Sequence, residues 1–397
     1  MASPTDSGRE EPGPGSQSSL RAANEQRIVS ALRTAGPLTQ AELSRRTSLA
    51  PSTVSGIVSI LTDRGLVRAD DEPGGRKGRL IRLDLEDRYV LGVELGNGHL
   101  SLALATLSAR VAEFVRKPLV LGADASTTLD LIESLLDDML VSVGASRSDL
   151  VRGGVAVPAP LDVHGILSSS PQIFPSWAGV DIAIVFSERF GVPFAVDNDA
   201  NLGGLADYLW GAGQGSHSMV FVGMNYGFGA GIILEGTLFH GATGVSGEIG
   251  HTTVDENGDF CQCGNRGCLN TVASINRALE LLAPIHPEID STEKLLDAAA
   301  DGLPPAVRVL TDMGRASGVA IANVVNLLNP EVIVVGGDLT RAGGVFTDPM
   351  ITMATRLSMP GAAGVRLLTT PLGERIFALG GVALALGLDA PQRLLLS

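Results

Sequence analysis

The sequence has few aromatic residues and no long apolar run. Two Trp, three Tyr and eleven Phe make up 4% of its 397 residues. A membrane-spanning helix needs about 18 consecutive apolar residues, and no such stretch occurs. Residues 1–23 are rich in Ser, Gly and Pro and lack the apolar core of a secretory signal, so we predict a disordered leader. These absences argue against a membrane protein and predict a cytoplasmic location.

Cysteine is also scarce, and its three copies, Cys261, Cys263 and Cys268, fall within eight residues. An odd, clustered set does not build a framework of disulfides. Together with His251 the cysteines form the pattern H-x9-C-x-C-x4-C, which offers four soft or borderline ligands. Such a set fits a closed tetrahedral Zn²⁺ site with no position for a reactive water. We therefore predict one structural zinc ion per chain, the alternative being reduced cysteines without a metal.

The charge of the chain is unevenly distributed. A chain of 397 residues should form two or three domains, and its net charge of −14 argues against nucleic-acid binding by the whole surface. Residues 24–83, however, contain ten Lys or Arg against six Asp or Glu, whereas residues 84–397 contain 17 against 34. A basic segment attracts phosphate while an acidic one repels it. This asymmetry predicts a DNA-binding head joined to a ligand-binding body.

Residues 24–85 have the pattern of a winged helix-turn-helix domain. Apolar residues recur at helical spacing in a first helix of about ten residues. A second helix should begin after Thr39, because Thr39 and Glu42 can form a capping box. A third helix should span about residues 51–64, and a β-hairpin with a basic, glycine-flanked tip at residues 74–79 should follow. The alternative is a small helical module that docks on another protein.

The residues predicted to contact DNA lie in the third helix and in the tip of the hairpin. Hydroxyl side chains in the third helix lie away from its apolar face, where they can contact phosphates and base edges in the major groove. Flexible cations at the tip can follow a narrow groove, as the wing of a winged helix does. These residues are Ser52, Thr53, Ser55, Arg76, Lys77 and Arg79.

The body, residues 88–397, alternates β-rich runs with glycine turns and helical stretches. This alternation is typical of α/β proteins, and the length of the body requires at least two cores. The runs expected to form strands are residues 90–93, 100–107, 153–157, 194–196, 219–223 and 332–335.

Two motifs relate the body to a known family. Residues 196–201 read Val-Asp-Asn-Asp-Ala-Asn, where a strand should end and a helix begin, and residues 247–251 read Gly-Glu-Ile-Gly-His, ahead of the cysteine cluster. These motifs and the order of the glycine turns resemble the two-lobed actin-like sugar kinases, specifically the ROK family (repressor, open reading frame, kinase). The resemblance covers nearly the whole chain from about residue 24. It implies a ribonuclease H-like ATPase fold with a sugar site between two lobes.

The resemblance also implies roles for single residues. Asp199 matches the aspartate that accepts the proton of the attacked hydroxyl in the kinases of this family, and Asn198 matches a residue that holds neighbouring hydroxyls. Glu248 and His251 match sugar contacts, with His251 also a zinc ligand, so that the metal would fix the loop carrying the sugar contacts. Asn270 stands where the family usually has a Glu that touches the sugar. Alone, an Asp-Asn-Asp sequence is more often a helix cap or a turn.

The two phosphate-binding turns depart from those of active kinases. Active relatives carry Asp-x-Gly-Gly-Thr after the first strand of the body, whereas residues 94–98 read Glu-Leu-Gly-Asn-Gly. In the second turn Tyr226 replaces a small hydroxyl residue. The longer Glu94 would displace a carboxylate meant to face Mg²⁺, and Tyr226 would crowd the phosphates. The sequence therefore predicts a body that binds a sugar without phosphorylating it.

Together these features predict a sugar-responsive transcription regulator of carbohydrate metabolism, most simply a repressor. Its ligands would be operator DNA and a sugar or sugar derivative, and it would act as a homodimer or homotetramer. Two alternatives stay open. One is an active ATP-dependent hexose kinase with a DNA-binding head, and the other is a regulator that responds to another protein through its body.

Overall fold

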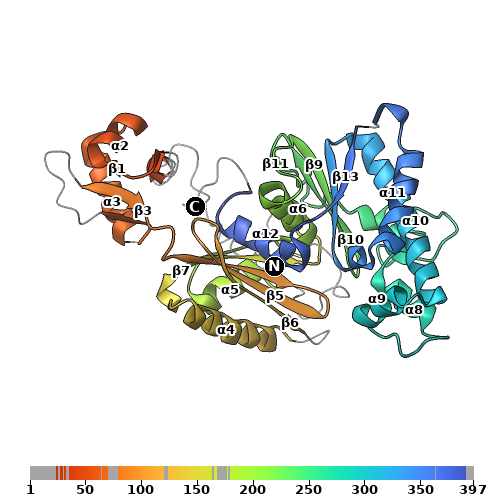
Figure 1. Cartoon of the computed structure of the whole chain (residues 1–397). Helices are drawn as coiled ribbons and strands as arrows, with labels where there is room; N and C mark the ends of the chain where they lie inside the picture. The colour runs from red at the N-terminus through yellow and green to blue at the C-terminus, as the bar shows by residue number, and fades with distance from the viewer. Residues whose placement is uncertain are drawn as a thin grey trace, which may run out of the picture. The chain divides into compact units, whose positions relative to one another are not determined.

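The protein divides into two compact units (Figure 1). One contains residues 1–89, 106–110 and 386–397, and the other contains residues 90–105 and 111–385. The computed structural model describes residues 24–389 apart from 26, 30, 33–34, 64, 70–78, 120–123, 163–164, 168–176, 178 and 363. The predicted disordered leader therefore lies outside the described residues. Among the helices described, none is both long and apolar enough to cross a membrane.

Three helical segments build the N-terminal unit, as the sequence predicted. Residues 24–35 are helical wherever they are described, and α2 (Gln40–Thr47) and α3 (Pro51–Asp63) follow. The predicted capping box is present, because the Thr39 hydroxyl accepts from the Glu42 backbone N–H at 3.2 Å while the Glu42 carboxylate accepts from the Thr39 N–H at 2.8 Å. The cap satisfies amides that would otherwise have no partner, and so marks where α2 begins.

A small antiparallel sheet completes the winged helix. The predicted hairpin consists of β2 (Val67–Ala69) and β3 (Leu80–Leu83). A third strand, β1 (Leu38–Thr39), pairs with β3, and the sequence did not predict it because two residues carry no readable alternation. The core beneath the sheet is apolar and buried, with Leu43, Val54 and Leu61 fully enclosed.

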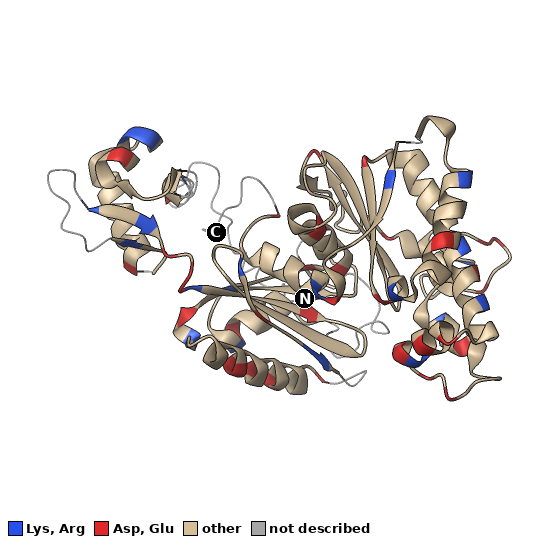
Figure 2. Ribbon diagram, viewed as in Figure 1, with Lys and Arg blue, Asp and Glu red and all other residues tan. Residues whose placement is uncertain are grey.

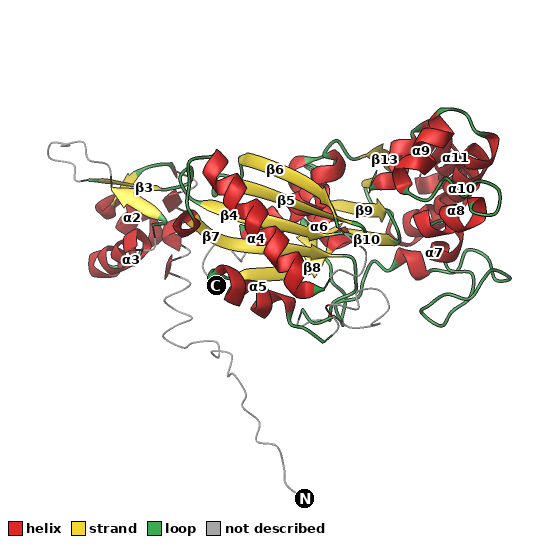
Figure 3. Cartoon of the chain, turned by 90° about the horizontal axis from the view of Figure 1, so that it is seen from below, coloured by secondary structure: helices red, strands yellow, loops and turns green. Residues whose placement is uncertain are grey.

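The second unit has two lobes, each built on a five-stranded sheet. In the N-terminal lobe the strand order is β6-β5-β4-β7-β8. Helices α4 (Ala125–Ser142) and α5 (Ile182–Phe190) lie along one face of this sheet (Figure 3). The strands are β4 (Tyr89–Leu95), β5 (His99–Thr106), β6 (Val111–Pro118), β7 (Leu150–Val157) and β8 (Phe194–Asn198).

The C-terminal lobe repeats this arrangement, with the strand order β11-β10-β9-β12-β13. In both lobes the first strand lies in the middle of the sheet. In this lobe it pairs antiparallel with the next strand and parallel with the fourth. The strands are β9 (Ser218–Met224), β10 (Phe228–Leu234), β11 (Thr237–Leu238), β12 (Val332–Gly336) and β13 (Arg366–Thr369). The helices are α7 (Leu269–Val272), α8 (Ile275–Leu282), α9 (Thr292–Ala300), α10 (Pro304–Leu328) and α11 (Gly344–Leu357).

Two helices pack between the sheets and join the lobes. Helix α6 (Asp199–Trp210) leaves β8 and packs on β9 and β10, whereas α12 (Ile376–Ala385) packs on β7 and on α6. Strand β7 and helix α12 approach each other so closely that glycine is required, since a Cβ on Gly154 would lie 2.2 Å from the carbonyl oxygen of Gly381. This crossing brings the first residue of α6, Asp199, to the region between the lobes.

All six runs predicted as strands in the body are strands. They correspond to β4, β5, β7, β8, β9 and β12. The sequence did not predict β6 and β13, which lie at sheet edges and contain no buried residue, so they lack an apolar pattern. It also did not predict β10, where glycines interrupt the apolar run, or the two-residue β11.

Candidate functional site

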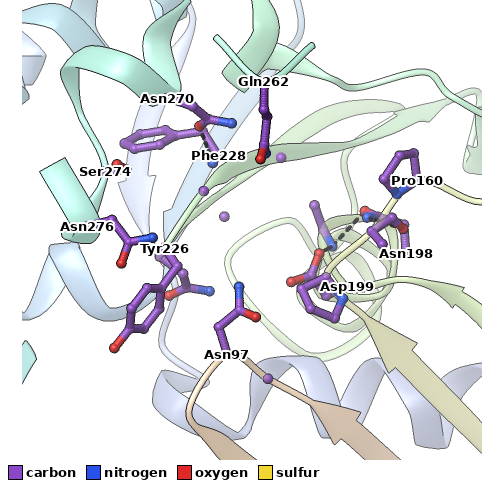
Figure 4. A pocket seen from close by; sticks show the side chains of 18 of the residues that line it. Asn97, Pro160, Asn198, Asp199, Tyr226, Phe228, Gln262, Asn270, Ser274 and Asn276 are labelled. Carbon is purple, nitrogen blue, oxygen red and sulfur yellow. Dashed lines mark hydrogen bonds between the residues drawn. The ribbon is translucent and has the colours of Figure 1, made fainter. Parts of the chain in front are cut away.

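A cavity of about 630 Å³ lies between the two lobes of the body. Its wall includes the turns that follow the first strand of each lobe, the first turn of α6 and the loop that carries the cysteines. Asn198 and Asp199 lie on one side, and Asn270 lies across from them (Figure 4). The cavity thus brings together every residue predicted to contact a sugar, namely Asn198, Asp199, Glu248, His251 and Asn270.

The side chain of Asn198 is committed mainly to capping α6. Its Oδ1 accepts from the backbone N–H groups of Ala200 at 2.9 Å and Asn201 at 3.3 Å. Its Nδ2 donates to the carbonyl oxygen of Ala159 at 3.2 Å. The helix-cap interpretation of the motif is therefore present in the structure, and one amide hydrogen of Asn198 is left for a ligand.

Asp199 is half-buried in the wall of the cavity, and its Oδ1 accepts from the Ala200 N–H at 2.7 Å. Burial raises the pKa of Asp199 to about 7, and the neighbouring charges of Glu94 and Glu248 act in the same direction. Burial also raises the pKa of Glu248. A carboxyl with a pKa near 7 can accept a hydrogen bond from a hydroxyl or, when protonated, donate one.

Asp197 has a structural role that sequence reasoning did not assign. This buried carboxylate accepts from the Asn201 amide at 2.9 Å, and its other oxygen lies 2.7 Å from Nε2 of His240. His240 lies in the loop that leads to Glu248. Asp197 therefore joins the strand end carrying Asn198 and Asp199 to the loop carrying Glu248; its only signal in the sequence was its place in the same motif.

In the first predicted phosphate turn, Glu94 pairs with a residue of its own turn. Glu94 is 3% exposed, and its Oε1 lies 2.8 Å from Nε2 of His99. Burial lowers the pKa of His99, but the hydrogen bond and the charge of Glu94 outweigh this, so that the pKa of His99 rises above its ordinary value. One oxygen of the carboxylate that would face a metal–nucleotide complex is thus engaged by an imidazole of the chain.

The second phosphate turn is held by side-chain carboxamides. Oδ1 of Asn270 accepts from the backbone N–H of Phe228 at 2.8 Å (Figure 4), and Oδ1 of Asn225 accepts from the N–H of Asp338 at 2.7 Å. The Tyr226 hydroxyl lies 3.9 Å from the position that a Cβ on Gly98 would take, so its ring reaches the first turn. The backbone N–H groups of Phe228 and Asp338, which could otherwise donate to a phosphate, are therefore already paired.

The four predicted metal ligands are clustered. The ligand atoms of His251, Cys261, Cys263 and Cys268 all lie within 4.8 Å of one another. Nδ1 of His251 is 3.4 Å from Sγ of Cys261, and Sγ of Cys263 is 3.6 Å from Sγ of Cys268. A tetrahedral Zn²⁺ with Zn–S bonds of about 2.3 Å separates its sulfurs by about 3.8 Å. The donor set and its spacing therefore fit a structural zinc ion.

Backbone hydrogen bonds hold the cysteine loop in place. The Val254 N–H donates to the carbonyl oxygen of Gly267 at 2.8 Å, and that of Cys261 donates to the carbonyl oxygen of Asn265 at 2.8 Å. Gly267 has a φ of +63°, and a Cβ there would lie 1.5 Å from the Asp255 carbonyl oxygen, so only glycine fits. Within this loop Gln262 extends toward the cavity (Figure 4).

The predicted DNA-contacting residues are placed only in part. Ser52 and Ser55 are exposed on α3, Thr53 is half-buried, and Arg79 is exposed beside β3. Basic residues lie on α2 and β3, whereas acidic residues predominate along α4 of the body (Figure 2). Arg76 and Lys77 lie outside the described residues.

Comparison with known proteins identifies both parts of the chain. The model of the ROK family matches residues 90–387, and that of the MarR family matches residues 23–77. A xylose repressor of Bacillus spizizenii is 26% identical, covering 92% of this chain and 95% of the relative, and a glucokinase of Halalkalibacterium halodurans is 30% identical, covering 75% and 94%. The crystal structure of a ROK family transcriptional regulator, a homologue of the Escherichia coli MLC protein, superposes with a TM-score of 0.71 at 26% identity, covering 92% of this chain and 95% of the other.

Proposed function

This chain belongs to the ROK family, and we propose that it is a sugar-responsive, DNA-binding repressor of carbohydrate metabolism that acts in the cytoplasm. A MarR-type head precedes the ROK body, so that the chain combines a DNA-binding domain with a sugar-binding fold. The observation that carries the proposal is the cavity between the lobes. It gathers five residues predicted as sugar contacts from segments that lie far apart along the chain, while the backbone N–H groups of Phe228 and Asp338, near the second phosphate turn, already have side-chain partners.

In this proposal the sugar binds between Asp199 and Glu248. Both carboxyl groups can accept hydrogen bonds from ligand hydroxyls, and His251 lies beside Glu248, with 3.9 Å between Nε2 of the imidazole and Oε2 of the carboxylate. A zinc ion held by His251 and the three cysteines would supply rigidity rather than catalysis, because no ligand position remains for water. His251 would hold the zinc ion through Nδ1, which lies on the side of Cys261, and its Nε2, on the side of Glu248, would stay available for a ligand hydroxyl.

The same proposal holds that the body has no kinase activity. Phosphoryl transfer depends almost entirely on positioning the phosphates and neutralising their charge. In this chain Glu94 is paired with His99, and Oδ1 of Asn225 accepts a hydrogen bond from the backbone N–H of Asp338. In addition, Arg116 of β6 reaches across to the other lobe, 3.5 Å from Asp338 and 3.2 Å from Glu374. These contacts use Glu94 and Asn225, which line the cavity, for pairing within the protein.

We expect no sugar-dependent turnover of ATP. Purified protein incubated with ATP, Mg²⁺ and a panel of hexoses should release no ADP above the rate without sugar, because Glu94 is paired with His99 and the backbone N–H groups of Phe228 and Asp338 already have partners. A coupled ADP assay with an active ROK glucokinase as positive control measures this. Several turnovers of hexose phosphate that disappear in Asp199→Asn would establish the kinase alternative instead.

DNA binding is assigned to the head. We propose that Ser52, Thr53 and Ser55 of α3 enter the major groove while Arg76, Lys77 and Arg79 contact the backbone or the minor groove. A homodimer or homotetramer would place two heads on half-sites about one helical turn, or a multiple of it, apart. Ligand then regulates binding only if the two quaternary states bind sugar with different affinity; a tenfold difference corresponds to about 1.4 kcal/mol.

The test is the effect of sugars on DNA affinity. Fluorescence anisotropy with fragments from upstream of the protein's own gene should reveal a specific site, and one class of sugar should change its Kd at least tenfold. Arg76→Ala with Lys77→Ala should weaken binding to every DNA sequence and reduce the salt dependence by about one unit per lost phosphate contact. A Kd that responds to a protein from cell extract but to no sugar would support the protein-responsive alternative.

A further inference from the structure

The orientation of the Asn270 side chain is determined by one hydrogen bond. Its Oδ1 lies 2.8 Å from the backbone nitrogen of Phe228, which can only donate. Exchanging the oxygen and nitrogen of the amide would set two donors against each other, so the assignment is unambiguous. The NH₂ group therefore lies on the other branch of the amide, and it points into the cavity (Figure 4).

The surrounding backbone holds this amide in place. A Cβ on Gly250 would lie 2.5 Å from Oδ1 and 2.6 Å from Nδ2 of Asn270, so the side chain packs directly on the glycine. Asn270 also comes two residues after Cys268, a fully buried member of the metal cluster. The NH₂ is thus a positioned donor, and a ligand group opposite it must accept a hydrogen bond.

Asp199 and Asn270 lie across the cavity from each other (Figure 4), and the polar groups of the cavity differ in what they offer a ligand. Asp199 and Glu248 present carboxyl oxygens, which suit the hydroxyls of a sugar. Asn270 presents its NH₂, and the carboxamide of Gln262 extends toward the same region from the cysteine loop (Figure 4). The ligand that fits best has hydroxyls on one side and an acceptor on the other.

We infer that this cavity selects a sugar that carries a carbonyl group facing Asn270, and that its ligand class is the N-acylated amino sugars. This inference rests on the proposed function, because it names the ligand of the same site. A carboxylate at position 270 would accept from a hydroxyl and repel an acyl oxygen, since both are acceptors. An amide donor at that position reverses this preference, because a carbonyl can only accept. An acidic sugar is disfavoured because its charge would lie among Glu94, Asp199 and Glu248.

Calorimetric titration of the zinc-loaded full-length protein tests the inference. The ligands are N-acetylated glucosamine, galactosamine and mannosamine, each compared with its parent hexose, with glucosamine and glucuronate as charged probes. At least one N-acetylated sugar should bind tenfold or more tightly than its parent hexose. Tighter binding of a plain hexose, of glucosamine or of glucuronate would overturn the inference.

Asn270→Asp separates this contact from the rest of the site. The variant is nearly isosteric and keeps an oxygen for the Phe228 N–H, but it replaces the NH₂ by a second acceptor. Affinity for the N-acetylated sugar should fall at least tenfold, whereas affinity for the parent hexose should change less than threefold. Asn276→Asp, which introduces the same charge beside Tyr226 (Figure 4), should keep the wild-type preference. An equal loss for both sugars in Asn270→Asp would overturn the inference.

Asn270→Glu supplies a second test, since it restores the residue usual in the family and should shift the preference toward the plain hexose. The titrations also distinguish a failure of this inference from a failure of the proposed function. If a plain hexose binds and changes DNA affinity while no N-acetylated sugar does, the inference is wrong and the proposed function stands. If no sugar of any class binds, both are wrong.

Discussion

Replacing Cys263 by Ser should remove the metal and the response to sugar together. Wild-type protein should contain one zinc per chain, and the variant less than a tenth of that, because a hydroxyl is a poor substitute for a thiolate ligand. Cys263 is exposed, so the substitution leaves the apolar core unchanged. The melting temperature should fall by about 5 °C or more, since metal binding supplies several kcal/mol and each kcal/mol shifts Tm by about 2–4 °C in a domain of this size.

The expected loss of sugar affinity is at least tenfold, because the loop that contains Cys263 begins at His251 and ends beside Asn270. Elemental analysis, thermal denaturation and calorimetry measure the three effects. Asn265→Ser is the matched control, since Asn265 is exposed in the same loop and contributes its backbone carbonyl rather than its side chain to the Cys261 N–H. Full zinc content and full sugar response in Cys263→Ser would show that the ligand assignment is wrong.

Asp199→Asn should stabilise the ligand-free protein at alkaline pH while it weakens sugar binding. The pKa of Asp199 is about 7 in the folded protein, well above the value near 4 expected when unfolded. The folded state therefore keeps a proton that the unfolded state releases, and wild-type stability should fall as pH rises from about 4 to 7. Asparagine carries no charge and avoids this loss. At pH 8 the variant should gain on the order of 2 kcal/mol, with the difference vanishing near pH 4.

The same substitution should have the opposite effect on sugar binding, which it weakens. An ionised Asp199 that accepts from a ligand hydroxyl contributes about 1.5–3 kcal/mol, so the variant should bind sugar roughly 10- to 100-fold more weakly at pH 8. Denaturation at several pH values and calorimetry at pH 8 measure the two effects. Asp301→Asn, at an exposed helix end, should change neither by more than about 0.5 kcal/mol. A variant that is less stable than wild type at pH 8 would contradict the assigned cost of burying this carboxylate.

Local sequence signals were sufficient where short-range physics decides the structure. The capping box at Thr39 and Glu42 involves residues three apart, and it was predictable because both hydrogen bonds close within one turn. The six strand predictions succeeded where apolar residues are buried on the sheet. They did not extend to strands without buried residues, such as β6 and β13, whose residues face solvent or are half-buried and leave no apolar pattern.

The hydrogen bonds that engage groups of the two predicted phosphate turns could not be predicted from the sequence. Asn270 and Phe228 are 42 residues apart, and Asn225 and Asp338 are 113 apart. Both hydrogen bonds depend on how the C-terminal lobe folds. The sequence identified Glu94 and Tyr226 as departures from active kinases through their size, but the pairing of Glu94 with His99 depends on the conformation of the turn.

By itself the sequence determined the family, the lobed α/β body behind a basic head, and the grouping of His251, Cys261, Cys263 and Cys268. Each of these follows from the identity and spacing of residues, which local chemistry constrains directly. Only the tertiary structure decided how the side chains of the cavity are arranged: Asn198 mainly as a helix cap, Asp199 as a carboxyl with a raised pKa, and Asn270 with its NH₂ toward the cavity. Burial and hydrogen-bond direction set these roles, and both depend on segments that meet only when the two lobes have folded together.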